Sequence, residues 1–460
     1  MIVATDCGST NMKAAVFTAD GSRLAESSIP LLYTIRTGSR VEFSPEDTRS
    51  CFQTLMANLC QMAGISCHEI RKVCFTSQAQ TFTVLDANGL PLSPFFGWAD
   101  SRADKEAVEL QARFGADFHR VTGLPVVSPK HMISKVLWWG RTHGQSRAMR
   151  FVSLPSYLAM QLGAAHVTDR NLAAMSGFYS IPDSHWWIHG LEAVGLEADQ
   201  LGELTNPGQV LPKCRRPKCA GFSPDIEVAM AGNDHTAGAL GGGCREGRPI
   251  LTLGTAGVIY RHAGETPGPF SPAGLWGPYP GGGYYELLCL NHACSALDWA
   301  DNILHGCIDS IRFVESIRLT HIREDSVLFY PDNWGSLRAW HGEGTLEEKA
   351  YAVLEGIGFA LRRLAGLHFC AEEEKIMVLG GGSRLDGWVQ LVANIFRRTL
   401  VRSDCDGLDG AATIAGVLAT YGREHTICPE LFYPDDTKDQ LLERRYRRWS
   451  EFDLRNACIK

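Results

Sequence analysis

The segment IVATDCGSTNMKAAVF, residues 2–17, decides the fold that the sequence predicts. Its apolar start at residues 2–4 is typical of a buried strand, and residues 12–17 predict a second strand. Asp20-Gly21 is a hairpin-turn signal between this strand and a third one at residues 24–28. The chain is therefore expected to open with strands that are joined by tight turns.

The turn between the first two strands gathers a carboxylate, small residues and a cation: Asp6, Gly8, Ser9, Thr10 and Lys13. Successive backbone N–H groups in such a turn form a concave site for anions, so the combination suits metal-bound phosphates. An ordinary hairpin, in which Asp6 and Ser9 only accept hydrogen bonds from turn amides, would explain the same residues. This turn alone does not decide between the two interpretations.

Three later segments have the same character and follow in order: AGND at 231–234, LTLGTAG at 251–257 and VLGGGSRLD at 378–386. Neither GxxxxGK[ST] nor GxGxxG occurs in the chain, which excludes a Walker-type or dinucleotide-fold explanation. Taken together, the four segments resemble the motifs of the FGGY carbohydrate kinases, which include the xylulose and glycerol kinases. The resemblance runs through nearly all of the 460 residues.

The resemblance implies an α/β fold of two actin-like ATPase (ribonuclease H-like) domains with a cleft between them. Turn-forming residues are concentrated between residues 201 and 225, so we place the domain boundary near Phe222. We expect residues 1–222 to carry the phosphate turn and the sugar contacts. Residues 223–460 are expected to carry the catalytic aspartate, the second phosphate turn and the adenosine motif.

Helical segments are predicted outside the four motifs. Ser44 and Pro45 form a capping signature before one of them. The predicted helices span residues 45–62, 101–113, 130–139, 346–367, 385–398 and 411–421.

Composition limits the class of protein. With 45% hydrophobic residues, the chain is long enough for two or three domains with substantial cores. A net charge of −7 with both signs interspersed argues against a nucleic-acid partner. Fifteen cysteines without a CxxC pair indicate reduced thiols rather than a zinc site or a disulfide framework. We find no signal sequence and no membrane-length apolar run, so no membrane contact and a cytoplasmic location are expected.

Phosphoryl transfer to a hydroxyl needs in-line positioning, charge neutralisation and a base. Asp234 stands between a predicted strand at 228–230 and a predicted helix start, and the resemblance implies that it is the catalytic base. Asp6 would hold Mg²⁺, mainly through water, and Lys13 would face the phosphates. The alternatives are that Asp234 is a helix N-cap and that Lys13 is a surface residue of a strand.

The resemblance also implies an ATP site. Its phosphate-binding residues would be Thr10, Asn11, Lys13, Gly254 and Thr255, and its adenosine motif would be Gly380, Gly381, Gly382 and Asp386. Glycine suits the adenosine motif because it has no side chain to clash and adopts positive φ freely.

Sugar contacts are implied for the first half of the chain, at Ala79 and Gln80 and at Trp98 and Asp100, with His235 beside the base. An indole offers a flat wall for C–H groups, and polar side chains can bind hydroxyls. Alternatively, Trp98 is a core aromatic and His235 is structural.

The chain also departs from the family pattern. Gln80 stands where xylulose kinases have histidine and glycerol kinases glutamate, and Ala79 stands where these have methionine or arginine. Cys294 replaces a glycine that commonly lines the nucleotide pocket, and residues 330–335 lack a common Gly-Glu-Arg run. The substrate therefore cannot be transferred from either relative.

Two hypotheses follow. The first is an ATP- and Mg²⁺-dependent kinase for a ketose such as a pentulose, or for a polyol or sugar acid. The second is a non-catalytic relative that binds sugar or nucleotide as a sensor. Asp6, Lys13, Asp234 and Thr255 together favour the enzyme, because a binding protein needs no base beside the acceptor hydroxyl. A chaperone-like ATPase would need a further β domain, for which we expect no room after Lys460. A homodimer is compatible with the resemblance.

Overall fold

The computed structural model describes residues 1–215, 217–219, 221–268, 270–304, 322–366, 375–417 and 430–457. The chain divides into two compact units. The first comprises Met1–Gly241, Ala263–Glu286 and Cys405–Arg423, and the second comprises Gly242–His262, Leu287–Asp404 and Glu424–Lys460. No helix in these described ranges is long and apolar enough to cross a membrane.

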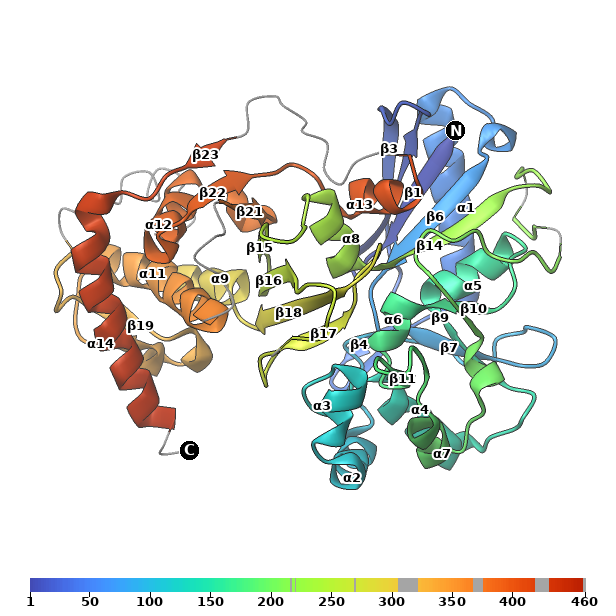
Figure 1. Cartoon of the computed structure of the whole chain (residues 1–460), viewed down its shortest axis with the longest axis horizontal. Helices are drawn as coiled ribbons and strands as arrows, with labels where there is room; N and C mark the ends of the chain where they lie inside the picture. Colours follow the sequence, from blue (N-terminus) through green and yellow to red (C-terminus); the bar gives the residue numbers. More distant parts are fainter. Residues whose placement is uncertain are drawn as a thin grey trace. The chain divides into compact units, whose positions relative to one another are not determined.

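A five-stranded mixed sheet organises the first unit, in the order β14-β6-β1-β2-β3 (Figure 1). The strands β1 (Ile2–Cys7), β6 (Lys72–Ser77) and β14 (Glu227–Asn233) are parallel, and β2 (Asn11–Phe17) and β3 (Arg23–Pro30) continue the sheet as antiparallel strands. Ligand sites of open α/β sheets lie at the carboxyl ends of such parallel strands. Asp6 and Asp234 both lie at that edge.

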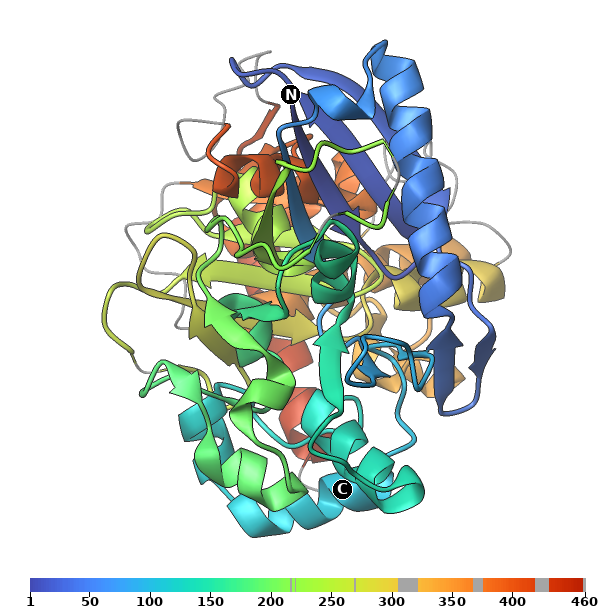
Figure 2. The ribbon, with the colours of Figure 1, turned by 90° about the vertical axis from the view of Figure 1, so that its right-hand side faces the viewer.

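The two faces of this sheet are covered by different helices, because successive side chains of a strand point to opposite faces. Val3 and Val73 belong to the core that includes α1 (Pro45–Ala63). Ala4 and Cys74 belong to a second core that includes residues of α13 (Gly407–Ile414). In Figure 2, α1 runs alongside the blue strands of the sheet. The far C-terminal part of the sequence therefore completes the N-terminal sheet.

A second sheet in the first unit has the order β4-β5-β8-β7-β9. Its helical neighbours share an aromatic-rich core with it, which contains Phe82, Phe96, Trp139 and Trp187. The remaining elements of the first unit are β4 (Ile35–Thr37), β5 (Arg40–Phe43), η1 (Cys67–Glu69), β7 (Phe82–Leu85), β8 (Phe95–Phe96), α2 (Asp104–Phe114), α3 (Asp117–Thr122), α4 (Met132–His143), β9 (Arg150–Ser153), α5 (Leu154–Gln161), β10 (Val167–Asp169), α6 (Arg170–Ala174), β11 (Tyr179–Ser180), β12 (His185–Trp186), α7 (Ile188–Val194), η2 (Ala198–Leu201), β13 (Glu203–Thr205), α8 (Asp234–Gly241) and β17 (Leu275–Pro278).

Five strands of the second unit form one sheet region in the order β16-β15-β21-β22-β23. Helices α11 and α12 pack on each other and share one apolar core with these strands. The elements are β15 (Ile250–Leu253), β16 (Gly257–His262), α9 (Cys294–Ile303), β19 (Leu328–Phe329), η4 (Pro331–Asn333), η5 (Leu337–Ala339), β20 (Trp340–His341), α11 (Leu346–Ala365), β21 (Lys375–Leu379), η7 (Gly381–Arg384), α12 (Asp386–Phe396), β22 (Thr399–Arg402), β23 (Leu431–Phe432), η8 (Asp436–Lys438) and α14 (Asp439–Ala457), while β18 (Tyr284–Leu290) spans the division between the units.

Most predicted elements agree with this architecture in place and type, but the helix predicted at 411–421 corresponds to α13, which begins earlier, at Gly407, and ends at Ile414. Ser44 caps α1 by accepting a hydrogen bond from the N–H of Asp47 at 3.1 Å, as its capping signature predicts. The predicted helices at 101–113, 130–139 and 385–398 correspond to α2, α4 and α12. Two predicted helix ends, at residues 367 and 418–421, lie outside the described residues.

The division into compact units differs from the predicted domains, 1–222 and 223–460. β14 lies after the predicted boundary but pairs with β6 in the N-terminal sheet, and α8 belongs to the same unit. The predicted boundary overlooks this pairing because turn-rich sequence marks a loop and does not show which sheet the next strand joins. The position of the domain boundary remains a prediction.

Candidate active site

The predicted phosphate turn lies at the carboxyl end of β1. Strand pairing sets Asp6 opposite Lys13 on β2 and beside Thr76 on β6. Because directly opposed residues project to the same face of a sheet, the carboxylate and the ammonium group share one face. Thr10 is exposed in the turn, and Asn11 begins β2. The acid and the cation predicted for the phosphates are therefore brought together by the backbone.

Asp6 is surrounded by more negative than positive charge. Its pKa is raised to about 7, first by burial and then by the charges of Asp234 and Asp406, against the lowering effect of Lys13. The Oδ1 atom of Asp6 is buried and has no hydrogen-bond partner among the described residues. Three acids thus interact at this edge of the sheet, and one carboxylate oxygen has unused acceptor capacity.

Asp234 is the first residue of α8, directly after β14. The residue before it caps the helix: the N–H of Thr236 donates to Oδ1 of Asn233 at 3.0 Å, and Nδ2 of Asn233 donates to Oδ1 of Asn171 at 2.6 Å. Asp234 Oδ1 accepts a local hydrogen bond from the N–H of His235 at 3.0 Å. The alternative interpretation of Asp234 as the N-cap is therefore wrong, because Asn233 fills that position.

The third acid comes from the far end of the sequence. Asp406 is the N-cap of α13, where its Oδ1 accepts from the N–H groups of Leu408 at 2.9 Å and Asp409 at 3.3 Å. Arg23 on β3 also donates to it, at 3.0 Å. Sequence analysis missed Asp406, although Asp at 406 and 409 before a run of small residues has the form of a capping box. That pattern predicts a helix start but gives no indication that residue 406 lies beside residue 6.

The second predicted phosphate turn lies between β15 and β16, in the second unit. The carbonyl of Gly254 accepts from the N–H of Cys294 at 3.1 Å, and that of Thr255 accepts from the N–H of Ser295 at 3.3 Å. The start of α9 therefore fixes this turn, and the Thr255 residue is exposed. Burial raises the pKa of the Cys294 thiol to about 11, so this thiol stays protonated at neutral pH.

The triple glycine follows β21 in the same unit. A Cβ at Gly382 would lie 2.6 Å from the ring of Trp388, so packing alone requires glycine there. Gly381 is exposed and has open space where a side chain would be. Asp386 begins α12, and its carboxylate forms an ion pair with Arg402. Only part of this motif is therefore free for an approaching ligand.

Gln80 lies in the turn after β6, with the unusual positive φ of 64°. Its Nε2 donates to the carbonyl of Met175, and its Oε1 accepts from the N–H of Met132 at 2.9 Å. Ala79 is half-buried beside it. The amide predicted to bind sugar hydroxyls is thus engaged with protein groups, although each end can form one more hydrogen bond.

Trp98 is 42% exposed, so its interpretation as a core aromatic is wrong. The Nζ atom of Lys130 lies 5.4 Å from the centroid of its ring, within the range of a cation–π interaction. His235, in the first turn of α8, is also exposed. Both side chains have the accessibility that contact with a small molecule requires.

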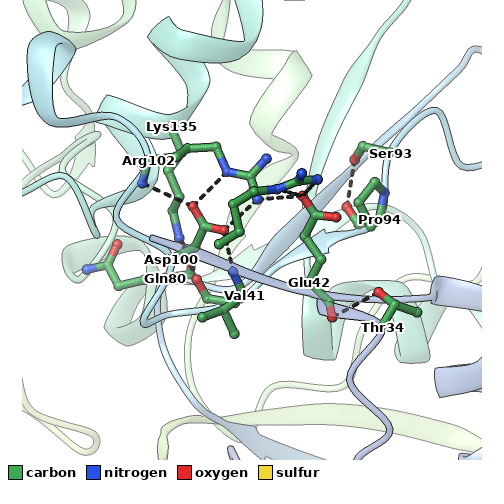
Figure 3. Close-up of polar contacts among 11 residues, drawn as sticks. Thr34, Val41, Glu42, Gln80, Ser93, Pro94, Asp100, Arg102 and Lys135 are labelled. Carbon is green, nitrogen blue, oxygen red and sulfur yellow. Dashed lines mark hydrogen bonds and ion pairs between the residues drawn. The ribbon is translucent and has the colours of Figure 1, made fainter. Parts of the chain in front are cut away.

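Asp100 has a different environment from the one predicted (Figure 3). It is fully buried, and Arg102 donates to its two oxygens at 2.9 and 2.6 Å. The N–H of Val41 donates to Oδ2 at 2.8 Å, and Arg102 also binds Glu42. A carboxylate that is withdrawn from solvent and saturated by protein donors is poorly suited to bind sugar hydroxyls.

A family model, that of the N-terminal domain of the FGGY family of carbohydrate kinases, matches residues 1–241. The chain belongs to this family. A xylulose kinase from Streptomyces rubiginosus is 28% identical over 452 residues, 91% of this chain and 88% of that relative. A gluconokinase from Bacillus subtilis (strain 168) is 25% identical over 454 residues, 90% of this chain and 86% of that relative. The structure of ligand-bound xylulose kinase from Lactobacillus acidophilus aligns with a TM-score of 0.86 at 21% identity, over 99% of this chain and 98% of that one.

This FGGY kinase is an enzyme with the two-domain actin-like ATPase fold, as the sequence predicts. Its first unit brings together Asp6, Lys13 and Asp234, and its second unit carries Gly254, Thr255, Gly381, Gly382 and Asp386. The homologues favour the kinase hypothesis over the non-catalytic one.

Proposed function

We propose that the protein transfers the γ-phosphoryl group of ATP to a hydroxyl of a small ketose or sugar acid, with Asp234 as the general base. The observation that carries the proposal is the separation of roles at the start of α8. Asn233 caps the helix, so the carboxylate of Asp234 is not needed for that purpose. A carboxylate beside the acceptor hydroxyl can accept its proton as the new bond to phosphorus forms.

The surroundings of Asp6 fit a magnesium ion. Its buried Oδ1 lacks a hydrogen-bond partner in the described part of the chain, and the neighbouring acids add negative charge. Within the same ranges, no group of three acidic, histidine or cysteine side chains forms a cage for a metal. Mg²⁺ is usually bound through one or two carboxylates, water and phosphate oxygens, so a single main ligand is sufficient. When bound, the ion would supply charge neutralisation for the phosphates.

Lys13 supports the phosphate role of the first turn. It lies opposite Asp6 in the hairpin, where a cation can attract phosphate oxygens on the face that carries the acid. In the second unit, the turn at Gly254 and Thr255 is fixed by the start of α9, so its exposed groups are held ready for a ligand. These features suit an enzyme whose main task is to position phosphates.

The relatives suggest two classes of acceptor. The similar proteins are named xylulose kinases and gluconokinases, which points to a five-carbon ketose or a six-carbon sugar acid. Trp98 offers an exposed aromatic surface for the C–H groups of either acceptor. Ala79 and Gln80 differ from the residues expected for xylulose or glycerol kinases, so the choice between acceptors rests on experiment.

The test is a coupled assay of ADP release with pentuloses, hexuloses, pentitols, glycerol and gluconate, each with ATP and with or without Mg²⁺. We expect Mg²⁺-dependent turnover with a ketose or gluconate and little with glycerol. Mass spectrometry of the product should show one added phosphoryl group. ADP release that is the same with and without every sugar would overturn the proposal, as would the absence of any turnover.

A further inference from the structure

Lys135 is a fully buried lysine in the first turn of α4. Its Nζ donates two hydrogen bonds, both at 2.9 Å, to the carbonyls of Gln80 and Gly97. One acceptor belongs to the predicted sugar-binding residue Gln80, and the other directly precedes Trp98. A single ammonium group therefore connects the two segments that carry the predicted sugar contacts.

The same end of α4 makes further contacts to these segments. The N–H of Met132 donates to the side chain of Gln80, so Gln80 is held by both its amide and its carbonyl. Lys130, just before α4, lies over the ring of Trp98. Gln80 has a positive φ, a conformation that costs free energy for a residue other than glycine and persists only where the surroundings enforce it. Lys135 is part of what enforces it.

The contacts of Lys135 differ from those of an ordinary buried ion pair. Its two hydrogen-bond acceptors are backbone carbonyls, although Asp100 lies close enough to favour its charged form and Arg102 to oppose it. Burial lowers the pKa of Lys135 to about 7, which shows that the environment disfavours the charge. An apolar side chain would fill the space without that penalty. Stability alone therefore does not account for a lysine at this position.

We propose that Lys135 is a positioning residue of the sugar site, which fixes the spacing of Gln80 and Trp98 and so sets sugar affinity and specificity without touching the sugar. This inference rests on the proposed function, since it requires that these two residues face the acceptor. A bound sugar is then recognised by a surface that is already in place, and less binding energy is lost in ordering that surface. Figure 3 shows Lys135 beside Gln80 and next to the Asp100–Arg102 pair.

The kinetic test compares Lys135→Met with Lys105→Met, a matched loss of an exposed lysine on α2. We expect Lys135→Met to raise the KM of the preferred sugar about tenfold or more, because small displacements of positioning groups have large effects. The KM of ATP should change less than about twofold, a difference below ~0.4 kcal/mol. The ratio of kcat/KM between a pentulose and gluconate should also move, whereas Lys105→Met should leave all three quantities unchanged. An equal increase in the KM values of the sugar and of ATP, or an unchanged sugar KM, would overturn the proposal.

Hydrogen exchange measured by mass spectrometry provides a test that does not depend on activity. In Lys135→Met, amides of peptides covering residues 78–82 and 97–102 should exchange faster than in the wild type, while peptides from β1 and β2 should not change. Unchanged exchange in both segments would refute the positioning role of Lys135 even if the kinetics changed. Faster exchange in both segments, in a protein whose wild type phosphorylates no sugar, would instead support the link that Lys135 makes between the segments and contradict the proposed function. Lys135→Arg retains a buried cation. It serves as the control for the possibility that faster exchange in Lys135→Met comes from unfolding of that variant.

Discussion

Asp6 and Asp100 lie in the same compact unit, where Asp6 is half-buried and Asp100 fully buried, and their negative charges have opposite surroundings. Asp100 receives hydrogen bonds from Arg102 and from the N–H of Val41, so its negative charge is compensated. Asp6 has two further acids nearby, one opposing lysine and a buried oxygen without a partner among the described residues. The first arrangement stabilises a fold, whereas the second is maintained at a cost.

This contrast separates two roles that the sequence predicts for the same residue type. A buried carboxylate with strong donors loses little by folding, but an uncompensated one destabilises the protein. Such costs are typical of sites where function requires unpaired charge. We therefore expect changes in the acidic cluster of Asp6 to reduce activity and to preserve or raise stability. Changes in the Asp100 cluster should mainly reduce stability.

The largest effect is expected at Asp234. Asp234→Asn should lower sugar-dependent ADP release by on the order of 10²-fold or more, because the amide cannot accept the proton of the hydroxyl. Nucleotide affinity, measured by titration calorimetry, should remain close to that of the wild type, and the melting temperature should not fall. A variant with near wild-type turnover would remove Asp234 from the role of base.

Arg102 provides the opposite case. Arg102→Met should lower the free energy of unfolding by about 3–5 kcal/mol, because it leaves the buried Asp100 without its paired cation, whereas Glu42 keeps its ion pair with Arg40. The matched control is Arg120→Met, whose ion pair with Asp117 is exposed and should contribute less than about 1 kcal/mol. Urea denaturation of both variants measures the difference. Similar small losses in the two variants would break the comparison.

Lys135, which lies near Asp100, extends the comparison to the pH dependence of stability. Its pKa is lowered to about 7 in the folded state, so between pH 7 and pH 10 the unfolded chain binds a proton that the folded chain lacks. The stability contributed at this position therefore rises with pH, by at most ~1.4 kcal/mol per unit. Of its charged neighbours, Asp100 opposes this shift and Arg102 supports it, and His131 is kept neutral.

Urea denaturation of the wild type and Lys135→Met at pH 7, 8 and 9 measures this effect. The difference between the two proteins should increase in favour of the wild type as pH rises. A difference that is constant over this range would show that Lys135 keeps its charge when the protein folds.

A smaller gain in stability is expected at Asp6. Asp6→Asn should raise the free energy of unfolding at pH 8 by about 1 kcal/mol, because it removes a buried charge that faces two others. The same variant should lose most of its Mg²⁺-dependent turnover. Asp117→Asn, on the protein surface, serves as the control for the loss of an aspartate. A clear decrease in stability for Asp6→Asn would contradict the assignment of Asp6 to an uncompensated cluster.

The sequence predicts the local parts of the site well. The apolar runs at residues 2–4 and 12–17 predict β1 and β2, the strands that set Asp6 opposite Lys13. The hairpin signal at Asp20-Gly21 predicts the turn from β2 into β3. The strand-to-helix junction at Asp234 is predicted for the same reason, because its residues are neighbours in the chain. Patterns within a few residues determine these features, so one sequence is enough to find them.

Features that depend on residues far apart in the chain cannot be predicted from such local patterns. Nothing near Asp406 indicates that it approaches Asp6, since 400 positions separate the two residues. The family resemblance implies a sugar contact at Asp100, but Val41 and Glu42 complete its environment from another strand. The sequence does not single out Lys135, because a lysine in a predicted helix is normally exposed.

The crossing of α8 and α13 depends on glycine: a Cβ at Gly410 would lie 1.7 Å from the carbonyl oxygen of Ala237. Through this crossing, residues synthesised well after β1, β6 and β14 cover the sheet face that includes Ala4. A ribosome releases β1, β6 and β14 long before it reaches α13. During that interval the nascent sheet has one bare face, and Asp6 lacks the neighbouring charge of Asp406. The end of the sheet that carries Asp6 is therefore complete only after α13 has been synthesised, and a chain interrupted before α13 cannot assemble it.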